Sequence, residues 1–407
     1  MSKRPAIHTK ATFYAYVKNL RHDQSSNRLR SLLDDVNIHL VMDPDKHGNP
    51  ILMLDPVIEF AVESKKHGLR MWMFPSVSLF TLTSKMRCGS ISLPAGPPGL
   101  DGTCAASSLG NELGFVCWGC YSLRNNYTYG STQLGQLTRM VWLQRQGKRL
   151  APQLQHALDS FNSHQRKVKI KLPTGHPSGK KSATVPINHH YFRLHDCGDF
   201  FSKDYYEAWL NVISRDRRCV YWAPTRMWAT AQASWFGRRP AHFVLRPSSL
   251  MFQAKPPRVS GMDAGSSSAD EENLAKTTRD CPAYATSNNN GVSCATANRG
   301  KGCRLCWLEP RTPVNYAPHG VSDKQTRRNP EQSLDELFEQ YQNEAAAVQT
   351  NPPARPAHDA SSEPYFEAWL GSRGARDEGE WLVWLEKRGI TGPEAYEYLQ
   401  AHAEWWM

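Results

Sequence analysis

Residues 191–247 decide the fold, and they read YFRLHDCGDFFSKDYYEAWLNVISRDRRCVYWAPTRMWATAQASWFGRRPAHFVLRP. Three short apolar runs typical of buried strands stand at Tyr191–His195, Val220–Ala223 and His242–Leu245. Between the first two, Asp204–Ser214 predicts an amphipathic helix, and between the last two we expect a further helix at Trp228–Trp235. Strands that alternate with helices predict βα units and a parallel sheet.

The same alternation begins upstream of this stretch. Residues 90–96 favour a strand that ends in a Pro/Gly loop, and apolar residues recur at helical intervals over 134–158. The basic segment Lys167–Pro186 contains Pro and Gly and predicts a hairpin or a mobile loop. We therefore expect an α/β protein whose core, residues 76–254, is a partial (β/α) barrel-like parallel sheet.

The two ends of the chain read as separate regions. Residues 1–75 predict an α+β extension that leads into a strand, with these elements: a helix over Ala11–Leu33, strands at Asn37–Met42 and Ile51–Leu54, a helix over Pro56–His67 and a strand over Trp72–Ser84. After the core we expect a linker with a four-cysteine metal module at 255–307 and a flexible linker at 308–360. A small helical module should follow at 361–407. It is acidic and holds five of the thirteen tryptophans, which suits docking to a protein partner.

The charge of the chain is unevenly distributed. Residues 331–407 carry 15 acidic and 5 basic side chains, which leaves 44 basic and 23 acidic ones in residues 1–330. This excess of positive charge in residues 1–330 has two interpretations: a basic surface that is simply solvated, or a surface that binds nucleic acid. An acidic end on a basic body can also fold back and screen it.

The sequence favours a soluble protein of the cytoplasm. Its first residues lead into mixed polar sequence without a secretory apolar segment, and no apolar run approaches the ~18 residues of a membrane span. In a reducing compartment the cysteines are metal ligands more often than disulfides.

Seven of the ten cysteines fall in two groups spaced as metal ligands. The first cysteine group is Cys104, Cys117 and Cys120; the second is Cys281, Cys294, Cys303 and Cys306. A CxxC pair lets two soft thiolates converge on one ion. Four thiolates can close a coordination shell, whereas three leave one position open for a further ligand. The second group suits structural zinc or an auxiliary iron–sulfur cluster equally, and buried cysteines without metal are the plainer alternative for both groups.

Polar residues follow two of the predicted strands, where parallel α/β folds gather functional side chains. In the stretch His195–Asp199, Asp199 is a functional carboxylate or the N-cap of the next helix, and His195 a proton-transfer group or a core histidine. Cys197 reads as a small buried residue. Thr225 and Arg226 suit either a bound carboxylate or phosphate or a surface salt bridge.

The first cysteine group, with Cys117-Trp118-Gly119-Cys120 after a predicted strand, resembles part of the radical S-adenosylmethionine signature. In that superfamily three thiolates hold a [4Fe–4S] cluster, and the fourth iron binds the methionyl part of the cofactor. The resemblance implies such a cluster on the first cysteine group. It also implies that Gly198 and Asp199 receive the amino group of S-adenosylmethionine, because a carboxylate pairs with an ammonium.

A second set of motifs resembles a small family named after a mycobacteriophage gene product, number eighty-eight, and found in phages and mobile elements. The shared motifs are Leu93-Pro94-Ala95, Cys120-Tyr121, Arg193-Leu194-His195-Asp196-Cys197-Gly198-Asp199-Phe200, Tyr221-Trp222-Ala223-Pro224-Thr225-Arg226 and Cys303-Arg304-Leu305-Cys306-Trp307. They span roughly residues 85–310. The resemblance implies family membership and leaves the reaction open.

These observations lead to two functional hypotheses. The first is an iron–sulfur protein of phage or mobile-element type, a radical S-adenosylmethionine-like enzyme acting on nucleic acid or protein, with His195 and Asp199 in the catalytic roles. The alternative is a non-enzymatic zinc protein that binds nucleic acid through its basic body. No phosphate-binding glycine loop and no His-Glu-x-x-His metalloprotease motif occurs.

Overall fold

The computed structural model describes residues 13–17, 30, 32–43, 48–64, 68–96, 98, 102–108, 116–117, 120, 122, 127, 130–172, 176–269, 278–281, 294 and 303–316. The chain divides into two compact units, residues 1–347 and 348–407, and every described residue belongs to the first unit. The predicted helical module at 361–407 lies outside the described residues, as does the linker beyond residue 316.

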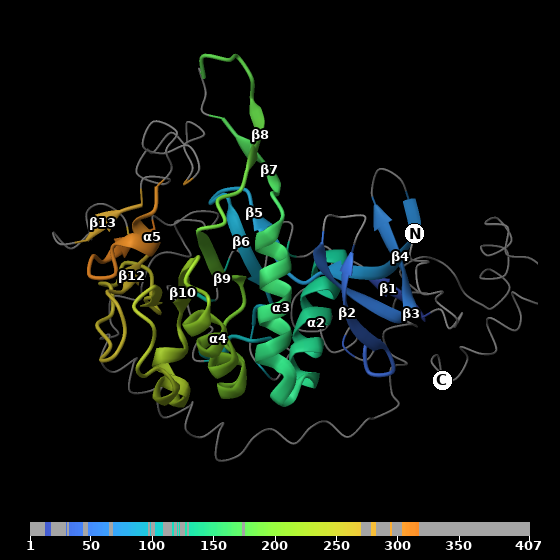
Figure 1. The fold of residues 1–407 in the computed structure, drawn as a ribbon, viewed down its shortest axis with the longest axis horizontal. Coiled ribbons are helices and arrows are strands. Elements are labelled where there is room, and N and C mark those ends of the chain that lie inside the picture. The colour runs from blue at the N-terminus through green and yellow to red at the C-terminus, as the bar shows by residue number, and fades with distance from the viewer. Residues whose placement is uncertain are drawn as a thin grey trace, which may run out of the picture. The chain divides into compact units, whose positions relative to one another are not determined.

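A five-stranded sheet forms the centre of the described part (Figure 1), in the order β11-β10-β9-β6-β5. Four of its strands run parallel: β6 (Cys88–Ser92), β9 (Tyr191–Cys197), β10 (Val220–Thr225) and β11 (Phe243–Pro247). The short strand β5 (Thr81–Thr83) pairs antiparallel with β6. Among the described residues the sheet ends at β5 and β11 without closing. The α/β class is therefore confirmed, whereas a barrel is not.

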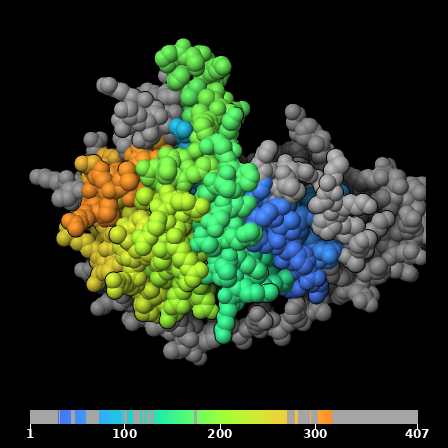
Figure 2. Space-filling model, viewed as in Figure 1, coloured from blue at the N-terminus to red at the C-terminus, as the bar shows by residue number. Residues whose placement is uncertain are grey.

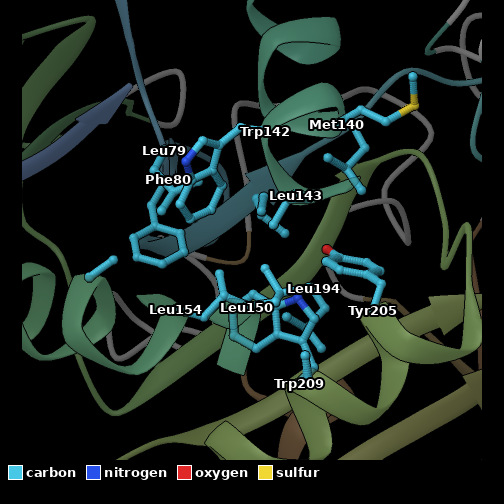
Figure 3. Close-up of a cluster of buried hydrophobic side chains, with 14 of the residues drawn as sticks. Leu79, Phe80, Met140, Trp142, Leu143, Leu150, Leu154, Leu194, Tyr205 and Trp209 are labelled. Carbon is cyan, nitrogen blue, oxygen red and sulfur yellow. The ribbon is translucent and has the colours of Figure 1, made fainter. Parts of the chain in front are cut away.

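Three helices cover one face of this sheet (Figure 1): α2 (Gly130–Arg145), α3 (Leu150–Ser163) and α4 (Lys203–Arg215). The single helical stretch predicted over 134–158 is divided by the 3-10 turn η6 (Gly147–Arg149), which starts at a glycine with φ of +53°. Figure 3 shows side chains from these helices and from β9 meeting in one core. There the rings of Phe80 and Trp209 lie 6.4 Å apart.

The strands carry a different set of side chains on each face. On β10, Tyr221 and Ala223 join the core beneath the helices. Val220 and Trp222 point to the other face, where they pack in a cluster that includes Trp307. Successive strand residues point to opposite faces, so this division follows from the two-residue period of a strand. The sheet thus lies between a helical layer and a layer built from later sequence.

That later layer consists of the short helix α5 (Leu305–Leu308) and a small parallel sheet in the order β12-β14-β13. The strands of the small sheet are two residues each: β12 (Ser266–Ser267), β13 (Arg279–Asp280) and β14 (Val314–Asn315). Trp307 of α5 lies against the central sheet and donates its indole N–H to the carbonyl of Phe192 at 3.1 Å. The buried Asn315 side chain links the small strands by donating to Ala269 O and Asp280 Oδ1, both at 2.8 Å.

Arg246 joins this layer to β11 from a fully buried position. Its five N–H groups meet five backbone carbonyls, at distances of 2.6–3.4 Å: Ala264, Leu305, Cys306, Glu309 and Thr312. A guanidinium offers five donors in one rigid plane, so one side chain satisfies the carbonyl ends of both α5 and the following turn.

A second sheet stands at the N-terminal side of the unit, in the order β1-β3-β2 with β4 also paired to β3. Its strands are β1 (Phe13–Val17), β2 (Asn37–Asp43), β3 (Asn49–Ser64) and β4 (Gly68–Ser78). The strand predicted at 37–42 is confirmed. The helices predicted over 11–33 and 56–67 are wrong at 13–17 and 56–64, because those residues pair with each other and with β4. The strand predicted over 72–84 divides into β4 and β5.

Two smaller features complete the described part. The helix predicted at 228–235 is a pair of 3-10 turns, η7 (Met227–Ala229) and η8 (Ala231–Trp235). The basic segment at 167–186 forms an antiparallel hairpin of β7 (Lys167–Lys171) and β8 (Ser182–Pro186), as predicted. None of the described helices is long and apolar enough to cross a membrane.

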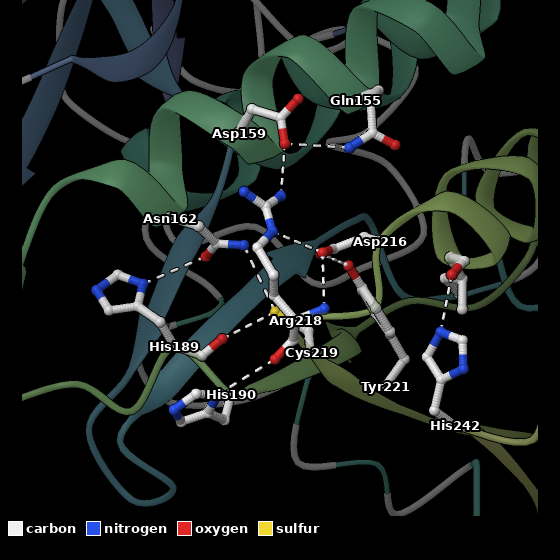
Figure 4. Close-up of polar contacts among 11 residues, drawn as sticks. Gln155, Asp159, Asn162, His189, His190, Asp216, Arg218, Cys219, Tyr221 and His242 are labelled. Carbon is white, nitrogen blue, oxygen red and sulfur yellow. Dashed lines mark hydrogen bonds and ion pairs between the residues drawn. The ribbon is translucent and has the colours of Figure 1, made fainter.

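A network of paired polar groups closes the amino edge of the central sheet (Figure 4). The buried Asp216 accepts from Arg218 Nε at 2.7 Å and from the Tyr221 hydroxyl at 2.6 Å, and Arg218 also bonds Asp159. Beside it, Cys219 donates to the carbonyl of His189. Because these polar groups are paired with one another, they stabilise the start of β10. We therefore assign this edge of the sheet a structural role.

Candidate functional site

A cavity of about 630 Å³ opens at the opposite, carboxyl edge of the central sheet. Segments that follow β6, β9, β10 and β11 line it, together with β12 and residues next to β13 and β14. The cavity continues along the sheet past Arg193 and Trp222 to the β5–β6 connection, Leu82–Met86. Six of the ten cysteines are on its wall: Cys104, Cys117, Cys120, Cys197, Cys281 and Cys294. The fold therefore brings members of both predicted cysteine groups, separated by about 160 residues of sequence, to one hollow.

The first cysteine group is held by the loop that leaves β6. Thr103 hydrogen-bonds Pro94 O through both its amide and its hydroxyl, and the Cys104 amide donates to Gly96 O at 2.9 Å. A 3-10 turn, η3 (Ala105–Ser108), follows at once. Cys117 and Cys120 form a turn in which the Cys120 amide donates to Cys117 O at 3.1 Å.

The side chains of this group are close enough to interact electrostatically. Burial raises the pKa of the Cys104 thiol well above its usual range, and the charges of Asp199, Cys117, Cys120 and Cys197 raise it further. Burial likewise raises the pKa of Cys117 to about 11, against the opposing influence of the Arg226 cation. At neutral pH the thiols of Cys104 and Cys117 are therefore protonated, even with the Arg226 cation beside Cys117.

Arg226 places a positive charge beside the first cysteine group. Its guanidinium hydrogen-bonds Cys117 and the carbonyl of Ser249, the latter at 2.9 Å from Nε. The sequence suggested a site for a carboxylate or phosphate at Thr225 and Arg226. Both residues line the cavity, and the Arg226 side chain is directed at the first cysteine group.

Cys197, predicted only as a small buried residue, also lines the cavity. It is 3% exposed and lies close enough to Cys120 for the two thiols to influence each other, while Ser122 and Gln136 hydrogen-bond it. Burial is the main cause of its raised pKa. The signal in the sequence was its position at the carboxyl end of a predicted strand, next to the Gly-Asp pair. Cys197 gives the first group a fourth neighbouring sulfur.

Gly198 is needed for the approach of two loops. Its φ is +83°, and a Cβ there would lie 2.5 Å from Thr103 Oγ1 and 2.7 Å from Leu93 Cβ. The sequence suggested that this glycine lets a ligand reach the backbone. In the structure the loop after β6 fills that space, and Thr103 Oγ1 accepts from the Asp199 amide at 2.8 Å.

Asp199 joins the ends of β9 and β10. Its carboxylate accepts from the Phe200 amide at 2.8 Å and from the Arg226 amide at 3.0 Å. It does not cap α4, because Ser202 is the N-cap and accepts from the Tyr205 amide. Burial raises the pKa of Asp199 to about 6, and the hydrogen bonds from Arg226 and Phe200 oppose that rise. The Thr225 side chain also hydrogen-bonds this carboxylate. A carboxylate has about four acceptor sites, so these three bonds leave capacity for one more donor.

His195 has a strained backbone. It has φ of +63° at the point where the β6–β9 register shifts, a conformation that costs a non-glycine residue about 1–3 kcal/mol. Its ring lies 4.5 Å from that of Phe200, its Nε2 hydrogen-bonds the Tyr205 hydroxyl at 3.1 Å, and its Nδ1 has no partner among the described residues. Burial lowers its pKa to about 3. The imidazole is therefore neutral, and His195, which is among the residues that line the cavity, keeps one ring nitrogen without a hydrogen-bond partner in the described part of the chain.

We expect this buried histidine to make the protein sensitive to acid. Because the folded pKa is about 3 and the ordinary value 6.5, the unfolded chain binds a proton that the folded chain refuses. As pH falls below 6.5, the free energy of unfolding should fall more steeply in the wild type than in His195→Gln. The difference in slope should approach about 1.4 kcal/mol per pH unit. Urea titrations of both proteins at several pH values measure it, and equal slopes would contradict a neutral buried His195.

The second cysteine group lies under a shell of cations. A hydrogen bond from Cys281 lowers the pKa of Cys294, and the charges of Lys85, Arg304 and Arg193 lower it further against burial. Arg193 stacks over Trp222 at 5.0 Å and Arg304 over Tyr191 at 4.5 Å. The two remaining members, Cys303 and Cys306, adjoin the cavity wall. Cys306 Sγ contacts the Tyr316 hydroxyl at 3.0 Å, and the Cys303 amide donates to Cys294 O.

The sulfurs of each group share a neighbourhood without surrounding a common centre. Among the described residues, no set of three or more Cys, His, Asp or Glu side chains is spaced to hold a metal ion. The donor chemistry does fit a soft metal, because thiols gather on the cavity wall with cations beside them. Closing a coordination shell would require the cysteine side chains to move toward one another.

Comparison with known proteins gives one match. Residues 61–309 match the family model described as gene product 88, and this match covers more than half of the chain. No curated protein and no solved structure matches the chain. The matched region contains the central sheet, both cysteine groups and every residue that lines the cavity except Tyr316.

Proposed function

The chain belongs to the gene product 88 family of phage proteins, and we propose that it is a metal–thiolate protein with an iron–sulfur cluster on its first cysteine group. The observation that carries the proposal is the common cavity. Thiols from both groups, a buried carboxylate and a neutral imidazole line a single hollow at the carboxyl edge of parallel strands. Binding and catalytic residues gather at this edge in α/β proteins.

Cys104, Cys117 and Cys120 would hold the cluster, and Cys197 stands beside them. When bound, such a cluster supplies one-electron chemistry and an iron that can take an additional ligand. Arg226 offers an N–H donor to Cys117, and hydrogen bonds to ligating sulfurs tune the electron affinity of a cluster. Asp199 keeps the loop that carries Arg226 in register with the loop after β9.

S-adenosylmethionine is the cofactor that we propose for the remaining space of the cavity. Asp199 retains acceptor capacity for an ammonium, and His195 Nδ1 offers a neutral nitrogen that can donate or accept a hydrogen bond. The unprotonated imidazole suits a site that must also accept a cationic sulfonium. On this proposal His195 and Asp199 contact the cofactor or the substrate, and the substrate is a nucleic acid or a protein.

For the second cysteine group we propose a metal bound by Cys281, Cys294, Cys303 and Cys306. Four thiolates around a zinc ion form a complex of charge −2, and burial of such a charge requires compensation. Lys85, Arg193 and Arg304 provide it, since all three cations lower the pKa of Cys294. An iron–sulfur cluster held by four thiolates is also negatively charged and needs the same compensation. The three cations therefore support a bound metal but do not distinguish zinc from iron.

Metal analysis tests the proposal. Protein purified without oxygen should contain iron, acid-labile sulfide and the visible absorbance of an iron–sulfur cluster. Cys117→Ser and Cys120→Ser should each remove the iron assigned to the first group, because each deletes one of its three proposed ligands. Cys303→Ser should remove only the metal of the second group.

Cys219→Ser is the matched control, because Cys219 is buried like Cys117 but bonds His189 at the amino edge of the sheet. It should retain all the metal. Zinc as the sole metal of the anaerobic protein would overturn the iron–sulfur proposal, and equal loss in Cys219→Ser would show that the cysteine variants act through misfolding. Equilibrium dialysis with S-adenosylmethionine tests the cofactor separately, with Asp199→Asn expected to weaken its binding at unchanged metal content.

A further inference from the structure

The hairpin β7–β8 stands out from the rest of the first unit (Figures 1 and 2). Its two strands pair only with each other in the described part of the chain. An isolated two-stranded hairpin is marginally stable in water. This one is secured at its base, where Arg87 donates twice to Pro186 O, at 3.0 and 3.2 Å, and the Ile187 amide donates to Arg166 O at 2.9 Å.

The two faces of β7 differ completely in character. Val168 packs against the main core and Ile170 is buried, so these side chains are directed inward. The alternating residues Lys167, Lys169 and Lys171 are all exposed on the other face. With a rise of about 3.3 Å per residue, the three ammonium groups follow one another at roughly 7 Å along the hairpin.

The charge of the hairpin is entirely positive. Between Asp159 and Asp196 the chain has no acidic residue, and it has seven basic ones. Lys180 and Lys181, just before β8, are also exposed. Among the described residues no salt bridge engages any of the five lysines of the hairpin. A stretch of lysines without carboxylate neighbours presents its full charge to a partner.

From these features we propose that the β7–β8 hairpin docks duplex DNA, with the ribbon in the major groove and its lysines on the flanking phosphates. The major groove of B-form DNA accommodates a two-stranded β-ribbon. Lysines at its surface meet phosphate oxygens, which position a protein without reading sequence. The deep, narrow major groove of A-form RNA does not admit such a ribbon, so duplex DNA is the polyanion that fits.

The surface of the hairpin favours DNA over an anionic membrane. Membrane-surface elements insert apolar or aromatic side chains into the headgroup region beside their cations. The exposed large apolar residues of the described chain are Met73, Leu82 and Leu308, and none belongs to the hairpin. Val168 and Ile170 face the protein, so the exposed lysines are the main attraction that the described part of the hairpin offers.

Salt-dependent binding of a random-sequence DNA duplex tests this proposal. In Lys167→Gln/Lys169→Gln/Lys171→Gln the slope of log affinity against log salt should become shallower by about three, because each phosphate contact contributes nearly one. Affinity at 0.1 M salt should fall on the order of 100-fold. Fluorescence anisotropy with the full-length protein gives both quantities, and circular dichroism checks that the fold is retained.

The matched control removes three equally exposed charges elsewhere, in Lys148→Gln/Arg149→Gln/Arg217→Gln. Its slope should change by less than one. Equal losses in both triple variants would overturn the proposal in favour of diffuse electrostatic attraction, and so would binding of phosphatidylserine vesicles with no binding of DNA. The proposal does not depend on metal, so it can fail while the iron–sulfur proposal stands, or stand while that one fails.

Discussion

Replacement of Arg246 by alanine should lower the free energy of unfolding by roughly 5 kcal/mol or prevent folding altogether. The substitution removes five hydrogen bonds to carbonyls. The carbonyls of Leu305 and Glu309 keep backbone amide donors, whereas those of Ala264, Cys306 and Thr312 lose the donor that Arg246 supplies, and each unsatisfied group costs about 1–3 kcal/mol. That loss is comparable with the whole stability of an ordinary domain. Urea unfolding followed by tryptophan fluorescence measures it, since Trp307 lies in the layer that Arg246 holds.

Two further variants keep this result interpretable. Arg246→Lys retains the charge but has three donors in place of five, so it should be intermediate in stability. Arg217→Ala removes an exposed arginine and should change stability by no more than about 0.5 kcal/mol. If Arg246→Ala were as stable as Arg217→Ala, the five hydrogen bonds would not be what joins α5 to the sheet.

The second large effect is expected for Gly198→Ala, which should cost about 2–4 kcal/mol. Part of the cost is the left-handed backbone at φ of +83°, and part is the collision of the new methyl group with Thr103 and Leu93. Thr103 also bonds Asp199 and Pro94, so its displacement should loosen the loop that carries Cys104. Thermal unfolding measures the stability, and metal content measures the damage to the site.

Gly147→Ala separates the two contributions. Gly147 has φ of +53°, but a methyl group added there would meet no atom within 4 Å, so only the backbone strain applies. We expect a loss of about 1–2 kcal/mol with unchanged metal content. Equal losses at both glycines would mean that the approach of the two loops at Gly198 is easily relaxed.

The central sheet was predictable because its signals are local. Buried parallel strands read as short apolar runs, and β9, β10 and β11 appear in the sequence within about two residues of their observed bounds. Helix α4 was equally clear, because Tyr205, Trp209 and Val212 return to one face every turn.

The N-terminal sheet was not predictable in the same way. Residues 56–64 carry Val57, Phe60 and Ala61 at helical spacing, yet they form the second half of β3. Pairing with strands on both sides decided their conformation, and such pairing depends on residues distant in the sequence. The length of β3 and its partners could not be read from the local pattern.

The site was predictable by residue type and less so by arrangement. The CxxC pairs, Gly198 and Asp199 were found from spacing and from their position after strands. What the sequence could not show is that both cysteine groups line one cavity, since that follows from how the segment after residue 250 returns over the sheet. Cys197 was predicted to be buried, but its approach to the first cysteine group was not, because that depends on how the loop after β6 folds. The position of Arg246 was not predictable, because a single buried arginine has no pattern of its own.

The two-residue alternation along β10 and β11 has an evolutionary consequence. Tyr221 and Leu245 serve the helical layer, whereas Trp222 and Arg246 serve the opposite one, although each pair is adjacent in sequence. Insertion or deletion of one residue inside either strand would exchange the two sets at once. Insertions and deletions among descendants of this chain should therefore be confined to the segments that connect the strands. Substitutions, in contrast, can change the side chains on the face that packs against α5 while the face beneath the helices stays the same.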